Sequence, residues 1–531
     1  MLLLGGLYAA DSGRRTAGLE GYAGLRGDMD MDMDMDNWQI ILIIVALYCA
    51  LVIAVGVFTR TKGESTLQDY FVGNRSLGAF VAFFTYVATF HSSFAFIGAA
   101  GQMYSSGIKF FATFTSCVVS PLMIYIIGRP TWYLGQKYNY MTQGELVGDY
   151  YESKALRYLV AVVSLVFLIP YLQSQIAAGG IIFQTITEGR VSYLLGCVIL
   201  YAVIISYILL GGFKAVAWTD TVQGILMIVM IWIAGGVILV RTSGSMNWSN
   251  LMQTMATQYP EKVLIPAEYW PTYMTSFISL FGISIYPPSF QRFFAVKNPK
   301  TLKWLSVTTP IYLIFFYVPI MIIAFSGVVY MPNLESADQV VPMMLTQYAS
   351  PILVGLVMAG ALAATMSSTD SQLHSASSIF TVDLYKGFKP DASDKQALFS
   401  GKTFIVIISA AALILSQYSS ALITTIVTIA LGGCLQILPS LIGALYWKGA
   451  SRLGALSGLI VGVIVVILTQ YVPAIKTPLG LSSGFWGLVC NLLVFFLVSR
   501  ATPKPSAATV QKFHGYLEEV NRQSDRKAAA R

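Results

Sequence analysis

The sequence predicts an all-α protein that crosses a membrane about thirteen times. Of its 531 residues, 56% are hydrophobic and only 11% are charged, a balance typical of polytopic membrane proteins. Apolar windows of about 20 residues, the length that spans a bilayer, recur along the whole chain. Two windows contain prolines or clustered polar residues at mid-depth, so we expect their helices to break inside the membrane.

The predicted spans follow one another with mostly short connections, and the tenth is shorter than the others. Several of the longer ones have room to tilt or bend in a bilayer. The spans are 38–59, 79–104, 108–134, 155–186, 192–211, 217–240, 271–295, 304–330, 349–384, 401–416, 420–446, 453–472 and 481–499.

The distribution of Lys and Arg predicts the orientation in the cell membrane. With the N-terminus outside, the inner loops contain most of the basic residues, as cytoplasmic loops do. These are Arg60, Lys62, Arg75, Arg129, Lys137, Lys154, Arg157, Lys214, Arg292, Lys297, Lys300, Lys303, Lys386, Lys389, Lys395, Lys402, Lys448 and Arg452. The outer loops contain only Lys109, Arg190, Arg241, Lys262 and Lys476. We therefore expect the N-terminus outside and the C-terminus inside.

Composition and motifs exclude several classes of protein. The net charge of +8 is explained by the loops, so we expect no nucleic-acid partner. No phosphate-binding glycine loop is present, which argues against an ATP-driven pump, and we expect no enzyme. The five cysteines have no metal or disulfide spacing. Residues 1–37, with their Met-Asp repeat, predict a disordered tail outside the cytoplasm, and 500–531 predict a short cytoplasmic tail.

The most unusual span contains Gly360–Phe380, where polar side chains follow one face of a membrane helix. They are Ser367, Ser368, Ser371, Gln372, Ser375 and Ser378. Lipid cannot satisfy such groups, so we expect the face to contact protein or water. Its hydroxyl oxygens suit a hard cation such as Na⁺, although they would also serve to join helices by hydrogen bonds. Asp370 and His374 are spaced to hydrogen-bond to each other.

Two interrupted spans favour the cation-binding interpretation. The second span has polar residues from Thr89 to Ser93 at mid-depth, and the seventh has the pair Pro287–Pro288, which removes two backbone donors. These two spans lie five apart in the order of the chain. Broken helices at corresponding positions of two halves mark the central site of many secondary transporters.

Four stretches resemble the sodium/solute symporter family, which includes sodium/proline, sodium/pantothenate and sodium/galactose symporters. Asp69–Gly78 (DYFVGNRSLG) is similar to the segment before the family's first core helix, and Gly211–Gln223 (GGFKAVAWTDTVQ) to its GGF…WTDTxQ signature. Pro287–Phe293 resembles the end of its broken helix. Ala364–Ser368 with Asp370–Leu373 resembles its AxxS[ST]…QL region.

The resemblance implies a LeuT-like core of ten helices in two inverted halves of five. In this chain the halves would be 79–240 and 271–446. One peripheral helix at 38–59 would precede them, and two at 453–499 would follow. The broken helices would then begin the two halves, as the polar and proline-containing windows also indicate.

The resemblance also implies one Na⁺ between the first and eighth core helices. Carried over by motif, its ligands are the backbone carbonyls of Ala88, His91 and Ala364 and the hydroxyls of Ser367 and Ser368. Asp220, in the WTDT motif, would attract Na⁺ leaving toward the cytoplasm. Capping of a helix N-terminus is the alternative role for this aspartate.

Substrate contacts are expected from the broken helices and the third core helix. Tyr171 aligns with a substrate-side tyrosine of the family. The further candidates are Gln175, Ser92, Ser93, Ser279, Ile283, Tyr286 and Pro287. The sodium/proline symporter has an aspartate where this chain has Phe90, which argues against proline as the substrate. Asp370 and His374 are expected to form a gate in the cytoplasmic half.

The sequence therefore predicts Na⁺-coupled symport of a small organic solute by alternating access. A monocarboxylate, amino acid or related acid is favoured, because no fixed acidic residue lines the expected pocket, and we expect a functional monomer. Two alternatives stay open. His91 would allow proton coupling if it titrates, although burial favours its neutral form. A sensor that uses a transporter fold without net transport is the other.

Overall fold

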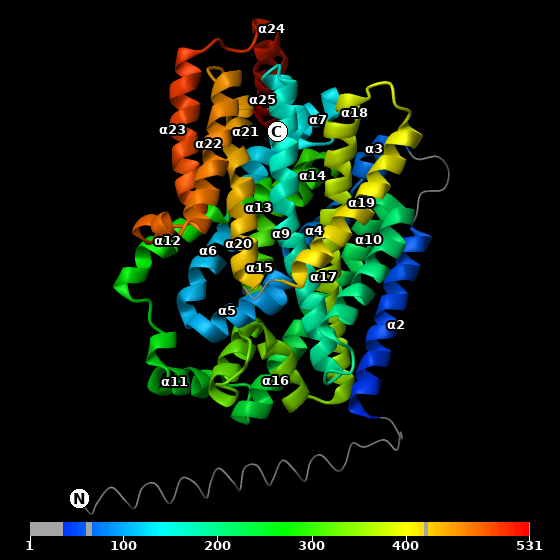
Figure 1. Ribbon diagram of the computed structural model, residues 1–531, viewed down its shortest axis with the longest axis vertical. Helices are drawn as coiled ribbons and strands as arrows, with labels where there is room; N and C mark the ends of the chain where they lie inside the picture. The colour runs from blue at the N-terminus through cyan, green and yellow to red at the C-terminus, as the bar shows by residue number, and fades with distance from the viewer. Residues whose placement is uncertain (1–35, 60–65, 419–422, 530–531) are drawn as a thin grey trace, which may run out of the picture.

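The computed structural model describes residues 36–59, 66–418 and 423–529, and these are mostly helical (Figure 1). No strand occurs among the described residues; one isolated bridge joins Leu77 and Val296. The disorder predicted for 1–37 falls almost wholly outside the described part. The longer helices run roughly parallel to one another, as a membrane domain requires.

The helices follow in chain order with short connections. They are α2 (Asn37–Phe58), α3 (Leu67–Val72), α4 (Ala79–Phe90), α5 (Ala99–Ser106), α6 (Phe111–Val119), α7 (Arg129–Tyr138), α8 (Gln143–Tyr150), α9 (Lys154–Ile186), α10 (Tyr193–Ser243), α11 (Ser249–Gln258), α12 (Trp270–Ser279), α13 (Gly282–Ile285), α14 (Pro287–Ala295), α15 (Pro299–Tyr330), α16 (Val340–Tyr348), α17 (Pro351–Ile379), α18 (Lys386–Phe388), α19 (Asp394–Ser416), α20 (Ile423–Cys434), α21 (Leu438–Tyr446), α22 (Arg452–Tyr471), α23 (Ser483–Ala501), α24 (Ala507–Val510) and α25 (Tyr516–Ala529).

By length and composition, ten helices of the described part are able to cross a membrane, so the predicted number of thirteen is not confirmed. The predicted spans 192–211 and 217–240 follow one another in α10, a stretch of 51 residues whose two helical parts are separated by the non-helical Gly212. The first part of the second predicted span, Ala79–Phe90, and the helix Tyr273–Ile285 of the seventh are too short to qualify, whereas the remainder of the second lies in the long span Phe94–Tyr138. The predicted class, an all-α polytopic membrane protein, is confirmed.

A glycine bends α10 where the two predicted spans meet. Gly212 has φ 59° and ψ −161°, a backbone conformation that other residues rarely adopt. A Cβ at this position would lie 2.9 Å from a ring carbon of Tyr70 in α3. The helix therefore changes direction against α3, and its second part brings the fully buried Asp220 into the interior.

Two helices are interrupted at the centre of the molecule, as the sequence predicts. α4 ends at Phe90, and the chain continues through His91 and the π-helical segment η2 (Phe94–Gly98) into α5. The second break is at Tyr286, which has φ −55° and ψ 130° between α13 and α14. The two units are joined directly, because Leu77 before α4 forms the bridge to Val296 after α14.

α17 is the central helix of the bundle. In the apolar 18-residue stretch of the span Pro351–Phe388, 83% of the residues are buried inside the protein, compared with 28% in that of α2. Every residue of α17 from Val357 to Ile379 is buried. The serine-rich face therefore contacts protein and not lipid, as expected from its polarity.

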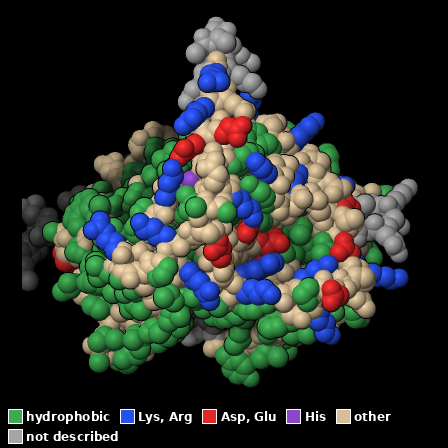
Figure 2. All heavy atoms as spheres, turned by 90° about the horizontal axis from the view of Figure 1, so that it is seen from above, with side chains coloured by type: hydrophobic (Ala, Val, Ile, Leu, Met, Phe, Trp, Pro, Cys, Tyr) green, Lys and Arg blue, Asp and Glu red, His purple; other side chains and the backbone are tan. Residues whose placement is uncertain are grey.

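The C-terminal segment folds back onto the loops at one end of the bundle (Figure 1). Phe513 is fully buried and packs against the rings of Tyr138, Tyr140 and Tyr150. The adjacent Lys512 pairs with Asp149 at 2.5 Å. The tail that composition alone describes as charged and Ala-rich is therefore docked on the connection between α7 and α8. Figure 2 looks onto this end, where Lys and Arg side chains gather.

We expect Phe513→Ala to release the C-terminal segment without unfolding the membrane domain. The substitution removes a buried ring, and short terminal helices are held mainly by such contacts. Hydrogen exchange of 506–529 should become faster, with the core helices unchanged. Glu519→Ala, an exposed position on the same helix, is the control. Unchanged protection of this segment in the Phe513 variant would contradict the role assigned to the ring.

Candidate functional site: an oxygen cluster between two broken helices

The serine pair of α17 contacts the interrupted end of α4. The hydroxyl of Ser367 donates to the carbonyl oxygens of Ala88 at 3.0 Å and Ala364 at 3.2 Å. The hydroxyl of Ser368 donates to the carbonyl oxygen of Thr89 at 3.1 Å. Five uncharged oxygen atoms from two helices thus gather in the buried interior, a ligand type that hard cations prefer. The structure brings together four of the five predicted cation residues and adds Thr89.

Side chains at the break free one of these carbonyls. In a continuous helix the Thr89 carbonyl would accept from the backbone N–H of Ser93. Instead, Ser93 N–H donates to Gln175 Oε1 at 3.0 Å, and Phe94 N–H donates to the hydroxyl of Ser92 at 3.1 Å. The backbone donors of the break are therefore satisfied by side chains, and the Thr89 carbonyl is available to α17.

The ring of His91 packs in an aromatic environment. Its Nδ1 lies 2.8 Å from the carbonyl oxygen of Val87, and its centroid is 4.0 Å from that of Phe316 and 5.0 Å from that of Tyr312. Nε2 has no hydrogen-bond partner among the described residues. No carboxylate contacts this ring in the described part, so the surroundings favour the neutral imidazole.

The two breaks meet at Tyr171 on α9. Its hydroxyl is 2.9 Å from that of Ser92, and its ring centroid is 5.0 Å from that of Tyr286. The Tyr286 hydroxyl is buried and has no partner among the described residues. Six of the predicted substrate residues are brought to this cluster: Tyr171, Gln175, Ser92, Ser93, Tyr286 and Pro287.

Ser279 lies apart from this cluster. Its hydroxyl donates to the carbonyl of Thr275 at 3.0 Å and is 2.6 Å from the hydroxyl of Ser482, just before α23. Its hydrogen bonds therefore join α12 to a peripheral helix. Ile283 is buried in α13, three residues before Tyr286.

Asp220 and Arg292 form an ion pair in the interior. Arg292 is 2% exposed and Asp220 is fully buried, with 2.8 Å between Nη2 and Oδ2. Thr85 donates to the same carboxylate oxygen at 2.5 Å, and the guanidinium also donates to the hydroxyl of Ser371 at 2.7 Å and the carbonyl of Pro288 at 2.8 Å. The pair therefore joins α4, α10, α14 and α17, one helical turn from the serine pair.

Two interpretations of the sequence are corrected by this pair. Arg292 is not a basic residue of an inner loop, because it is buried and bonded to its neighbours in the interior. Asp220 does not cap a helix, because it lies well inside the helical part of α10 that follows the bend at Gly212. The error about Arg292 is explained by the proline break. A charged residue a few positions after two prolines is easily taken as the point where the membrane span ends and a loop begins.

The proposed gate residues have separate partners. Asp370 accepts from the hydroxyl of Tyr207 at 2.9 Å, and His374 Nε2 lies 2.9 Å from the carbonyl oxygen of Tyr70. The hydrogen bond expected between them is not formed in the described part. Each side chain instead joins α17 to a different neighbour, α10 or α3.

A charged cluster that the sequence patterns do not reveal lies at the end of α17. Asp383 accepts from the hydroxyl of Thr142 at 2.9 Å and from Arg157 Nε at 2.8 Å. Arg157 also approaches Glu145 at 3.4 Å. One feature of the sequence could have predicted this cluster. Asp383 is an acidic residue inside the predicted span 349–384, and an acid at such a position needs a buried partner.

The pKa of Glu145 provides a test of this cluster. Burial, and then the charge of Asp383, raise it from 4.5 to about 7. A carboxyl with a raised pKa in the folded state stabilises that state when protonated, so its contribution is present below pH 4.5 and is lost as the pH rises through about 7. Relative to Glu145→Gln, which keeps the helix-capping oxygen, we expect the wild type to lose thermal stability over that interval. If the thermal stability of the two proteins changes with pH in the same way, the role assigned to Glu145 is wrong.

Interrupted helices that meet at a buried cluster of neutral oxygens define a cation-coupled secondary transporter. The chain belongs to the sodium:solute symporter family, which matches residues 70–462. It is accordingly a multi-pass membrane protein that couples the transport of small solutes to Na⁺, and its relatives are transporters and not enzymes.

Similar proteins cover nearly the whole chain. It is 29% identical over 478 residues to the high-affinity proline transporter PutP of Bacillus subtilis, covering 87% of this chain and 98% of the relative. It is 28% identical over 480 residues to the sodium/pantothenate symporter of Haemophilus influenzae, covering 87% and 95%. A solved Na⁺-coupled sialic acid symporter, in a substrate-bound outward-open state, has a TM-score of 0.74 at 20% identity, covering 88% and 99%. This last similarity establishes the LeuT-like fold.

Proposed function

We propose that the chain imports a small organic acid, such as a monocarboxylate or amino acid, together with Na⁺ by alternating access. The observation that supports this best is the contact of Ser367 and Ser368 with the carbonyls of Ala88 and Thr89. A cation placed among these oxygens would hold α17 to α4. Its binding would thereby stabilise one arrangement of the two helices over the other.

The proposed Na⁺ ligands are the hydroxyls of Ser367 and Ser368 and the carbonyls of Ala88, Ala364 and His91. Hydroxyl and carbonyl oxygens suit a monovalent cation, which needs no carboxylate to balance a second charge. The Thr89 carbonyl is a further candidate, because Ser368 already contacts it. Among these, the His91 carbonyl rests on the family resemblance alone.

The proposed substrate site is the cluster around Tyr171, with Ser92, Ser93, Gln175 and Tyr286. None of these residues is ionised at neutral pH, so an acid would meet no fixed negative charge there. The unpartnered hydroxyl of Tyr286 offers a hydrogen bond, and α14 begins at Pro287 with its positive dipole end beside the cluster. Hydroxyl and amide donors beside a helix N-terminus favour a carboxylate.

The proposed cycle uses the two inverted halves, 79–240 and 271–446. With the N-terminus outside, Na⁺ would leave past Asp220 toward the basic end of the protein. Separation of Arg292 from Asp220, and of Asp370 and His374 from their partners, would open that path. In the cell membrane, each charge moving down the potential contributes about 2.3 kcal/mol per 100 mV. We expect the monomer to complete this cycle, since both breaks belong to one chain.

Uptake by proteoliposomes tests this proposal. A panel of radiolabelled monocarboxylates, amino acids and dicarboxylates would be offered under an inward Na⁺ gradient, with K⁺ and choline as controls. Accumulation of a monoacid in Na⁺ alone is expected. Uptake that follows a proton gradient and needs no Na⁺, or specific binding without accumulation, would contradict the proposal.

A further inference from the structure

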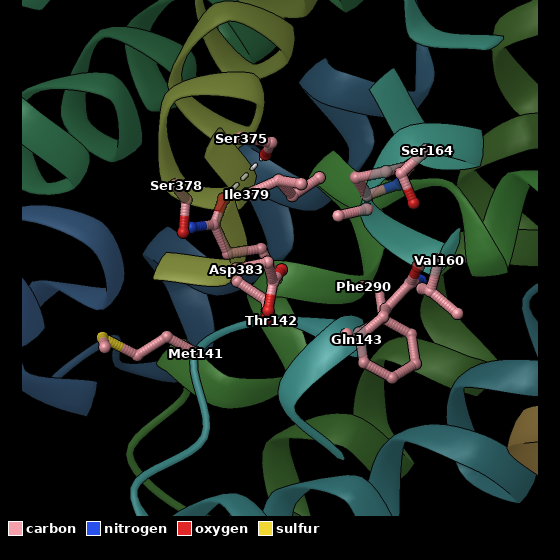
Figure 3. Close-up of a pocket in the computed structure, with 14 residues that line it drawn as sticks. Met141, Thr142, Gln143, Val160, Ser164, Phe290, Ser375, Ser378, Ile379 and Asp383 are labelled. Carbon is pink, nitrogen blue, oxygen red and sulfur yellow. Dashed lines mark hydrogen bonds between the residues drawn. The ribbon is translucent and has the colours of Figure 1, made fainter. Parts of the chain in front are cut away.

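A small pocket separate from the serine pair lies between α8, α9, α14 and the end of α17 (Figure 3). Its wall includes Gln143, Ser378 and Asp383, together with Pro287 and Phe290 of the second broken helix. The pocket therefore lies beside the proposed substrate region, toward the end of α17 that leads to the basic face.

Three buried oxygens at this pocket have no hydrogen-bond partner within the described part of the chain. They are Asp383 Oδ2, Gln143 Oε1 and Ser378 Oγ, from residues that are 0%, 5% and 1% exposed. The other polar atoms of the two larger side chains are already bonded. Asp383 Oδ1 accepts from Thr142 and Arg157, and the amide nitrogen of Gln143 donates to the carbonyl of Ile285. The unpartnered atoms of Asp383 and Gln143 can only accept.

The charges around the pocket also favour a cation. Asp383 and Glu145 carry two acidic groups against the single positive charge of Arg157. None of the described residues that line the pocket is Lys or Arg. A buried acceptor without a partner costs free energy, so these oxygens need a ligand. A water molecule supplies only two donors for three oxygens and does not balance the negative charge.

We propose that this pocket binds a second monovalent cation, Na⁺, held by Asp383, Gln143 and Ser378. Carboxylate, amide and hydroxyl oxygens are ligands for hard cations. The site lies apart from the serine pair, so a cation that leaves the pair would meet it before reaching the basic face. The inference rests on the proposed Na⁺ coupling, and it adds an inner position on the cation's route.

Equilibrium binding of ²²Na⁺ to the purified full-length protein in detergent tests the site, because both sides are accessible there. Asp383→Asn removes the charge and is isosteric, and its amide oxygen can keep the contacts to Thr142 and Arg157. Ser378→Ala removes one ligand. Ser377→Ala is the matched control, because Ser377 is equally buried and unpartnered but lies against Gly401, outside the pocket.

We expect wild type and Ser377→Ala to bind two Na⁺ per chain. Asp383→Asn should bind one, and Ser378→Ala should bind its second at least tenfold more weakly. The Ser367→Ala/Ser368→Ala variant should also bind one. Circular dichroism in choline confirms that each variant is folded. A single wild-type site, lost only in the double serine variant, would overturn this inference and leave the proposed coupling site intact. No saturable binding in the wild type would overturn both.

Discussion

Replacing Arg292 by Met should cause a large loss of stability. The change leaves the Asp220 carboxylate buried without its charge partner and removes the donors to Pro288 and Ser371. Breaking a buried ion pair on one side costs about 3–5 kcal/mol. Thermal unfolding in detergent should show a clear fall in the midpoint. Arg292→Lys should recover only part of it, because one ammonium cannot replace the planar guanidinium.

A double-mutant cycle separates the pair from general packing effects. Asp220→Asn removes the charge that Arg292→Met leaves unpaired, so the double variant should lose less stability than the sum of the two single variants. Additive losses would show that the two residues stabilise the fold independently. That result would contradict the role of the pair in joining α4, α10, α14 and α17.

The second large effect is expected from Ser367→Ala/Ser368→Ala, as loss of the part of the Na⁺ response that the serine site supplies. Removing both hydroxyls deletes two of the proposed ligands and separates α17 from the carbonyls of Ala88 and Thr89. Na⁺ binding to the folded state raises its stability by mass action, and the part of this increment that comes from the serine site should disappear. Na⁺-dependent uptake should fall to background.

Thr369→Val is the control for that variant. Thr369 lies on the same helix, but its hydroxyl donates to the carbonyl of Thr365 within α17 and not to α4. The substitution preserves side-chain volume and should leave the Na⁺ response intact. Equal loss of the response in Thr369→Val would point to a general disturbance of α17.

The meeting of the serine pair with the break is what the family resemblance implies, whereas the sequence patterns themselves predict the helical class and the two interrupted helices. These features depend on local patterns, such as the polar residues from Thr89 to Ser93 and the adjacent Pro287 and Pro288. The same patterns show that lipid cannot face the serine-rich part of α17. Burial of that helix confirms the expectation.

The interior ion pair could not be read from the same patterns. Asp220 and Arg292 lie 72 residues apart in the chain, and each stands near the end of a predicted span. Counting basic residues in loops treats every arginine near a span end as solvated, whereas the bend at Gly212 and the break at Tyr286 bring this one inward. Pairing of distant charges depends on tertiary packing.

The docking of the C-terminal segment could not be predicted from the sequence either. Its composition predicts a solvated tail, because charged and small residues dominate after Arg500. Phe513 docks it on three tyrosines of the α7–α8 region, and Tyr516 and Leu517 also pack against the protein. A few apolar side chains in a polar segment give too weak a periodic signal to predict either the helix or its partner.

The central claim is that Na⁺ binds where Ser367 and Ser368 meet the broken helix α4. The most direct test is thermal unfolding of the purified protein in Na⁺, K⁺ and choline at matched ionic strength, beside the Ser367→Ala/Ser368→Ala variant. We predict a higher unfolding midpoint in Na⁺ than in K⁺ or choline for the wild type, and a clearly smaller difference for the variant, which keeps only the inner cation site proposed at Asp383. The same Na⁺-specific increase in both proteins would contradict the site, because stabilisation would then come from elsewhere in the chain.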